Sequence, residues 1–144
     1  MIKPIPPPQG ETTEARQWVA EQLGLPYQDD MQDWPWEVAD AACVEEYLQL
    51  YARAGDTERI VLMEMLLQAA TEQRTPQKRR VAWAKIEALL TQNADLHAAT
   101  AHYWCLWGYE GKGFHITPHV RAWWIAHYPI PDDLADDKLL NDQL

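Results

Sequence analysis

The 144 residues suffice for one domain, and an apolar fraction of 47% excludes disorder of the whole chain, because enough apolar surface is present to offset the entropy of ordering. The two cysteines are too few for the disulfide framework of a small secreted protein, and the longest apolar stretch, residues 60–67, is too short to cross a bilayer. The first residues lack the apolar core of a signal peptide, so we expect a cytoplasmic protein with no membrane contact and with reduced thiols.

The net charge of −10 is unevenly distributed along the chain. Residues 11–64 carry 13 acids and three arginines, whereas residues 65–128 carry four acids, seven bases and all five histidines. Residues 129–144 add five acids and one lysine. Such asymmetry bears on the choice of partner and on encounter rates more than on the fold.

The first half of the chain begins with a proline-rich arm, residues 1–10, which cannot join a helix interior. A first helix is predicted over 11–23, where early acids complement the helix dipole and Gly24 with Pro26 ends it. Residues 26–35 are predicted to form a polar loop. A second helix is predicted over 36–54, because its apolar residues recur at spacings of three and four: Ala41, Val44, Leu48 and Tyr51.

The third predicted helix, residues 57–73, is apolar on most sides. Only Glu64, Gln68 and Glu72 form a narrow polar stripe along it. A helix apolar almost all round lies in the centre of a domain. We therefore expect it to be the core of the fold, with four side chains largely buried: Leu62, Met63, Leu66 and Leu67.

The second half of the chain repeats a helix-start signal. Thr75-Pro76 and Thr117-Pro118 each combine a capping hydroxyl with a first-turn proline, and Asn93 can cap a helix between them that ends at Gly108. Ala82, Trp83, Ile86, Leu89 and Leu90 are expected to face inward on the fourth helix. Leu96, Ala99, Tyr103 and Leu106 are expected to do so on the fifth, and Val120, Trp123, Trp124 and His127 on the sixth.

These elements predict an all-α fold, a single compact bundle of about six helices joined by short loops. The predicted α-helical domain covers residues 11–128, and residues 129–144 are expected to be an acidic, flexible tail. The composition is also compatible with a homo-oligomer.

No motif specifies a reaction, so we predict no catalytic residue, no cofactor and no metal. His115 and His119 are separated by a predicted helix start, and His97 and His102 are spaced for different helix faces. We expect solvated or locally hydrogen-bonded histidines. The glycine-rich loop 108–113 lacks the Ser or Thr of a phosphate-binding loop, and the chain contains no serine nucleophile. An enzyme of unrecognised type stays an alternative.

Basic residues gather over residues 74–85, namely Arg74, Lys78, Arg79, Arg80 and Lys85. This segment makes a nucleic-acid-associated regulator the second alternative. The strongly negative whole chain opposes binding to a polyanion, however. We expect these bases to pair mainly with the acidic first half of the chain, or with another copy.

The best candidate for a partner surface is the acidic, tryptophan-bearing segment before and within the second predicted helix. Its predicted partner-binding residues are Asp29, Asp30, Asp33, Trp34, Trp36, Glu37 and Asp40, with Glu45 and Glu46 extending the acidic face. Carboxylates steer a basic partner and tryptophan anchors the centre of an interface. The alternative is that both tryptophans fold back as a lid on the bundle. We expect a non-catalytic protein–protein interaction module, such as an acidic inhibitor or immunity-type protein with a basic partner.

Overall fold

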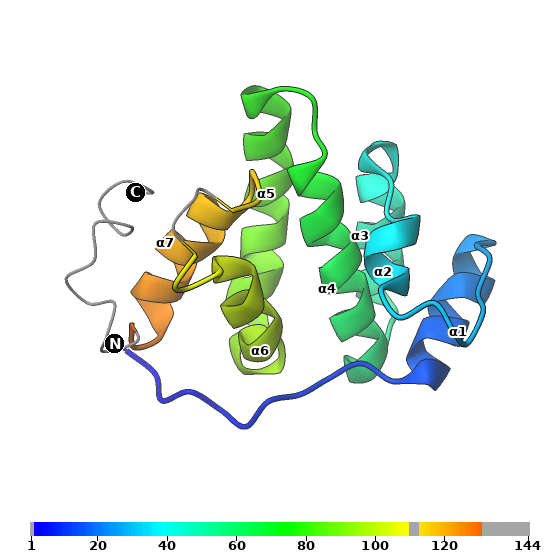
Figure 1. Cartoon of the computed structure of the whole chain (residues 1–144), viewed down its shortest axis with the longest axis horizontal. Helices are drawn as coiled ribbons and strands as arrows, with labels where there is room; N and C mark the ends of the chain where they lie inside the picture. Colours follow the sequence, from blue (N-terminus) through cyan, green and yellow to red (C-terminus); the bar gives the residue numbers. More distant parts are fainter. Residues whose placement is uncertain (1, 110–112, 131–144) are drawn as a thin grey trace. The chain divides into compact units, whose positions relative to one another are not determined.

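The computed structural model describes residues 2–109 and 113–130, and every regular element in these residues is helical (Figure 1). The predicted all-α fold is confirmed. Residue contacts divide the chain into two compact units, one formed by residues 10–86 and the other by residues 2–9 with the described part of 87–144. We call them the α4 unit and the α6–α7 unit. The expected domain extent, residues 11–128, stays a prediction, and residues 131–144 of the expected tail lie outside the described residues.

The α4 unit is built around one buried helix, α4 (Asp56–Thr71). Four elements pack against it: α1 (Thr13–Leu23), α2 (Trp34–Val38), the 3₁₀ helix η1 (Ala41–Cys43) and α3 (Val44–Ala52) (Figure 1). The side chains predicted to form the core are all fully buried: Leu62, Met63, Leu66 and Leu67. The predicted central helix is confirmed, because only a surrounded helix can bury apolar residues on all its sides.

Helix α1 ends on the expected glycine, and it begins on a hydroxyl cap that was not predicted. The Thr12 hydroxyl accepts a hydrogen bond from the Ala15 N–H at 3.1 Å, so the helix starts two residues later than predicted. Gly24 adopts a left-handed conformation, φ 66°, and its N–H bonds the carbonyls of Ala20 and Glu21. Both caps satisfy backbone groups that a helix terminus leaves without partners.

The single helix predicted over residues 36–54 is wrong, because this segment forms α2, η1 and α3 in succession. Ala39 is extended (φ −65°, ψ 137°), and Asp40 starts η1 by accepting a hydrogen bond from the Ala42 N–H at 2.9 Å. The Asp40 N–H itself donates to the Tyr47 hydroxyl at 2.9 Å. Side-chain partners for the backbone thus replace helical hydrogen bonds at this point.

The next helix is α5 (Pro76–Gln92), and the boundary between the two units falls within it, after Ile86. Its start is the predicted one: the Thr75 hydroxyl accepts from the Lys78 N–H at 3.1 Å, and Pro76 opens the helix. A proline fits there because the first helical N–H has no partner within the helix.

The α6–α7 unit pairs α6 (Ala94–Cys105) with α7 (Thr117–His127). The inward face predicted for this part of the chain is wrong for α6: Tyr103 is exposed, and Leu96, Ala99 and Leu106 are only half-buried. The buried face consists of Ala94, His97, Ala98, Thr100, Ala101, Trp104 and Cys105. His97 is therefore a core residue and not a solvated one. Small residues on this face let neighbouring helices approach closely. The prediction followed the spacing of larger side chains such as Leu96 and Tyr103, and so it selected the wrong face of α6.

The C-terminus of α6 is completed by a buried arginine from α7. Arg121 is fully buried; its Nε donates to the Cys105 carbonyl at 2.5 Å and its Nη2 to the Leu106 carbonyl at 2.9 Å. Leu106 is left-handed, φ 49°, so the helix ends there, two residues before the predicted Gly108. The guanidinium satisfies carbonyls that the end of a helix leaves unpaired.

Candidate functional site

The loop between α1 and α2 is fixed to the rest of the α4 unit by two side chains. Arg16 donates to the carbonyls of Met31 and Gln32, each at 2.9 Å, and also pairs with Glu11. The Trp34 indole N–H donates to the Pro26 carbonyl at 2.7 Å. The loop is therefore held at both ends by charged or buried donors.

The two tryptophans predicted to anchor a partner fold onto the α4 unit instead. Trp34 is 0% exposed and packs edge-on against Tyr27, with ring centroids 5.7 Å apart. Trp36 is half-buried, and its indole N–H donates to a Glu64 carboxylate oxygen on α4 at 2.6 Å. The expectation of an exposed Trp34 anchor is wrong, and the lid alternative describes this residue. The cause is tertiary: α2 packs against α4, the Pro26 carbonyl accepts from Trp34, and Glu64 on α4 accepts from Trp36.

The predicted acidic side chains are all exposed: Asp29, Asp30, Asp33, Glu37 and Asp40. We refer to them as the acidic surface. Asp40 has a structural role as well, since it caps η1 and contacts Tyr47. Burial raises the pKa of Tyr47 to about 12, so its hydroxyl stays protonated at neutral pH. The acidic surface is therefore exposed as predicted, but the buried Trp34 does not lie at its centre as an accessible anchor.

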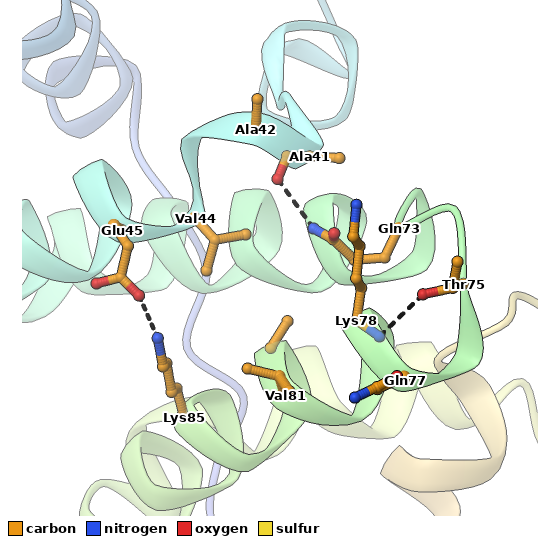
Figure 2. A pocket seen from close by; sticks show the side chains of 11 residues that line it. Ala41, Ala42, Val44, Glu45, Gln73, Thr75, Gln77, Lys78, Val81 and Lys85 are labelled. Atoms are coloured by element: carbon orange, nitrogen blue, oxygen red, sulfur yellow. Dashed lines mark hydrogen bonds and ion pairs between the residues drawn. The ribbon is translucent and has the colours of Figure 1, made fainter.

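A groove that the sequence analysis did not identify lies between α5 and the η1–α3 segment of the same unit, with a volume of about 580 Å³ (Figure 2). We call it the α5 groove. Its lining residues come from three stretches of the α4 unit: Ala41, Ala42, Val44, Glu45, Gln73, Thr75, Gln77, Lys78, Val81, Ala82 and Lys85.

The middle of the α5 groove is apolar and its ends are polar. Figure 2 shows Val44 and Val81 between the two walls, with the pair formed by Glu45 and Lys85 at one end. At the other end the Gln73 amide donates to the Ala41 carbonyl at 2.9 Å. Val81 is 55% exposed, so its apolar side chain is accessible within the groove. A concave apolar patch with polar ends is the usual form of a binding site.

The basic residues near the groove differ in their accessibility. The Nη2 of half-buried Arg79 donates to the Gln73 carbonyl at 3.3 Å, and Lys85 pairs with Glu45. Arg74, Lys78 and Arg80 remain exposed. The expected pairing of this basic segment with the acidic first half of the chain is confirmed for the Lys85–Glu45 pair. The sequence signal for the groove was Val81, an apolar residue three positions after Lys78 and four before Lys85.

The thiols and the potential metal ligands do not form a reactive site in the described residues. Burial raises the pKa of both the Cys43 and the Cys105 thiols, which disfavours the nucleophilic thiolate form. Within residues 2–109 and 113–130, no three His, Cys, Asp or Glu side chains come together in a geometry that could hold a metal ion. Residues 110–112 of the glycine-rich loop lie outside the described part of the chain.

Comparison with known proteins assigns no relative to this chain: no family model, no characterised protein and no solved structure shows significant similarity to it. Among the described residues, no helix has the length and apolar character needed to span a membrane.

Proposed function

We propose that this protein is a non-catalytic protein–protein interaction module that binds its partner through the α5 groove and the adjoining acidic surface. The observation that carries the proposal is the groove itself, because it combines an apolar centre, exposed Val81 and polar ends in one concavity. Interfaces of this kind derive affinity from a desolvated apolar centre and specificity from the polar rim.

A basic partner fits the charge of this region best. Asp40, Glu45 and Glu46 are exposed on the η1–α3 side of the groove, and they continue the acidic surface that begins at Asp29. Carboxylates so placed accelerate the encounter with a cationic protein and make it sensitive to salt. The proposal includes an inhibitor or immunity-type role in the cytoplasm, in which the acidic surface covers a basic protein.

Two other roles have less support. A nucleic-acid-associated regulator would use residues 74–85, where Arg74, Lys78 and Arg80 are exposed while Arg79 and Lys85 already have partners within the chain. Three cations on a chain with a net charge of −10 form a small footprint for a polyanion. An enzyme of unrecognised type would need reactive groups, and the pKa values of both thiols are shifted away from reactivity.

Site-directed photocrosslinking in source-cell lysate tests the proposal. A photoreactive side chain at Gln77, which lines the groove, is expected to crosslink one discrete protein. The same group at Ala84, an exposed α5 position outside the groove lining, is the matched control. Val81→Asp should abolish the Gln77 crosslink. Equal crosslinking from both positions, or crosslinking to nucleic acid alone, contradicts the proposal.

The charge of the partner is tested separately by charge reversal. Asp29→Lys with Asp30→Lys should weaken the captured complex and reduce its dependence on salt, whereas Lys78→Glu should strengthen it. The opposite pattern would retain the groove as a binding site and reject the basic partner.

A further inference from the structure

A second concavity lies in the α6–α7 unit, where the proline-rich arm of residues 2–9 runs against α6 and α7. The Lys3 N–H donates to the His127 carbonyl at 2.7 Å, and the Lys3 ammonium lies 3.7 Å from an Asp95 carboxylate oxygen. Figure 1 shows the arm as an extended segment that starts beside the end of α7. The arm therefore occupies this surface of its own unit in an extended conformation.

The pocket beneath the arm has a volume of about 250 Å³. Its arm side consists of Ile5, Pro6 and Pro8, and its helix side of Ala98, Ala99, His102 and Trp124. Two alanines make room for a chain to approach α6, and the rings of His102 and Trp124 meet edge-on with centroids 5.1 Å apart.

The spacing of two arm residues that line this pocket, Ile5 and Pro8, fits a polyproline II segment. Such a segment repeats every three residues, which places Ile5 and Pro8 on the same side. Pro7, between Pro6 and Pro8, does not line the pocket. Aromatic and small side chains are the surfaces on which proline-rich segments dock, because such segments lose little entropy on binding. The α6–α7 surface thus contacts an extended proline-rich segment in which a lysine precedes the apolar residues.

Much of the arm is exposed to solvent. Ile2 and Ile5 are 52% and 55% exposed, and the Lys3–Asp95 pair joins side chains that are 46% and 62% exposed. Exposed ion pairs of this kind contribute about 0–1 kcal/mol. The contact also leaves the pocket volume incompletely filled, so a ligand with larger apolar groups would gain contacts that the arm does not make.

We propose that this α6–α7 surface is a binding site for a lysine-containing, proline-rich segment of another protein, and that the N-terminal arm is its intramolecular competitor. A second copy of the same chain is the weaker occupant. Its arm is identical to the tethered one, and the tethered arm has an effective concentration of about the millimolar range. A different segment displaces the arm by filling the remaining volume.

A peptide with the sequence of residues 2–9, labelled with fluorescein, serves as the probe. The full chain is compared with Ile5→Asp/Pro8→Asp, which removes the arm contacts, and with Pro7→Asp as the matched control. We expect the peptide to bind the Ile5→Asp/Pro8→Asp chain at least about tenfold more tightly than the wild-type or Pro7→Asp chains, because the competitor has been weakened. Fluorescence anisotropy measures these affinities.

The location of binding is checked by NMR shifts of Ala98, Ala99 and the Trp124 indole N–H in the Ile5→Asp/Pro8→Asp chain. Adding Ala99→Arg should abolish binding. The peptide variants Pro6→Ala/Pro8→Ala and Pro7→Ala keep the test independent of folding, and only the first should lose affinity. Equal affinity for all chains, or no binding to any, overturns the proposal. A wild-type dimer that disappears on Ile5→Asp/Pro8→Asp substitution overturns it in favour of a second copy.

Discussion

Trp34 and Val81 have opposite environments in the α4 unit. Trp34 lies in the segment whose charge and aromatic content predicted a partner surface, yet it is 0% exposed and hydrogen-bonded to the Pro26 carbonyl. Val81 lies in a segment whose basic residues suggested contact with nucleic acid, and it is 55% exposed in the apolar middle of the α5 groove. The larger side chain stabilises the fold, and the smaller one is available to a partner.

This difference shows that the size of an aromatic residue does not determine its role. A tryptophan side chain has a large apolar area that packs against any available apolar surface. Because α4 belongs to the same chain, its surface is available to Trp34 whether or not a partner is present. A valine on an amphipathic helix is left exposed when no element of the same unit covers it. We therefore expect stability to depend on Trp34 and α4, and partner binding to depend on Val81.

Trp34→Ala should have the largest effect on stability. Removing this buried indole should lower the free energy of unfolding by about 3–5 kcal/mol, since it opens a cavity against α4 and leaves the Pro26 carbonyl without its donor. Urea denaturation followed by circular dichroism measures it. An unchanged midpoint combined with loss of partner binding would restore Trp34 as an interface anchor.

Leu66→Ala tests the helix that buries Trp34. Leu66 is fully buried in α4, so its truncation should cost about 2–5 kcal/mol. Arg80→Ala on the exposed side of α5 is the control, with an expected change within about 0.5 kcal/mol. If Leu66→Ala lowered the free energy of unfolding no more than Arg80→Ala does, Leu66 would not belong to the core and α4 would not be the central helix.

Arg16→Met tests whether the acidic loop is held in place. The side chain donates to the carbonyls of Met31 and Gln32, so its loss should cost about 1–3 kcal/mol and should speed proteolysis within residues 26–33. Arg53→Met, which removes an exposed contact with Gln22, should leave the loop resistant. Loop cleavage at the wild-type rate in Arg16→Met would mean that Trp34 alone holds the loop.

Val81→Asp should have the smallest effect on stability, within about 0.5 kcal/mol, because the side chain is largely in solvent already. It should nevertheless remove the crosslink from Gln77, since a carboxylate in the apolar centre of the groove opposes docking. Thermal denaturation and photocrosslinking of the same preparation provide both readouts. A destabilisation comparable to that of Leu66→Ala would assign Val81 to the core.

The sequence by itself determined the features that depend on neighbouring residues. The end of α1 at Gly24 and the start of α5 at Thr75-Pro76 follow from glycine, hydroxyl and proline chemistry within one turn. The burial of α4 follows from apolar residues on most of its sides, which favour a central position. These signals lie within one turn or recur along a whole helix, so they predict helix ends and burial without knowledge of the fold.

Only the tertiary structure decided which surfaces remain free. The burial of Trp34, the division of residues 36–54 around Asp40 and the small-residue face of α6 each depend on partners that lie elsewhere in the chain or on another helix. The α5 groove likewise exists because residues 41–45 and 73–85, far apart in sequence, come to line one space. Burial is a property of contacts between elements, and the pattern of one helix specifies its apolar positions without specifying what will cover them.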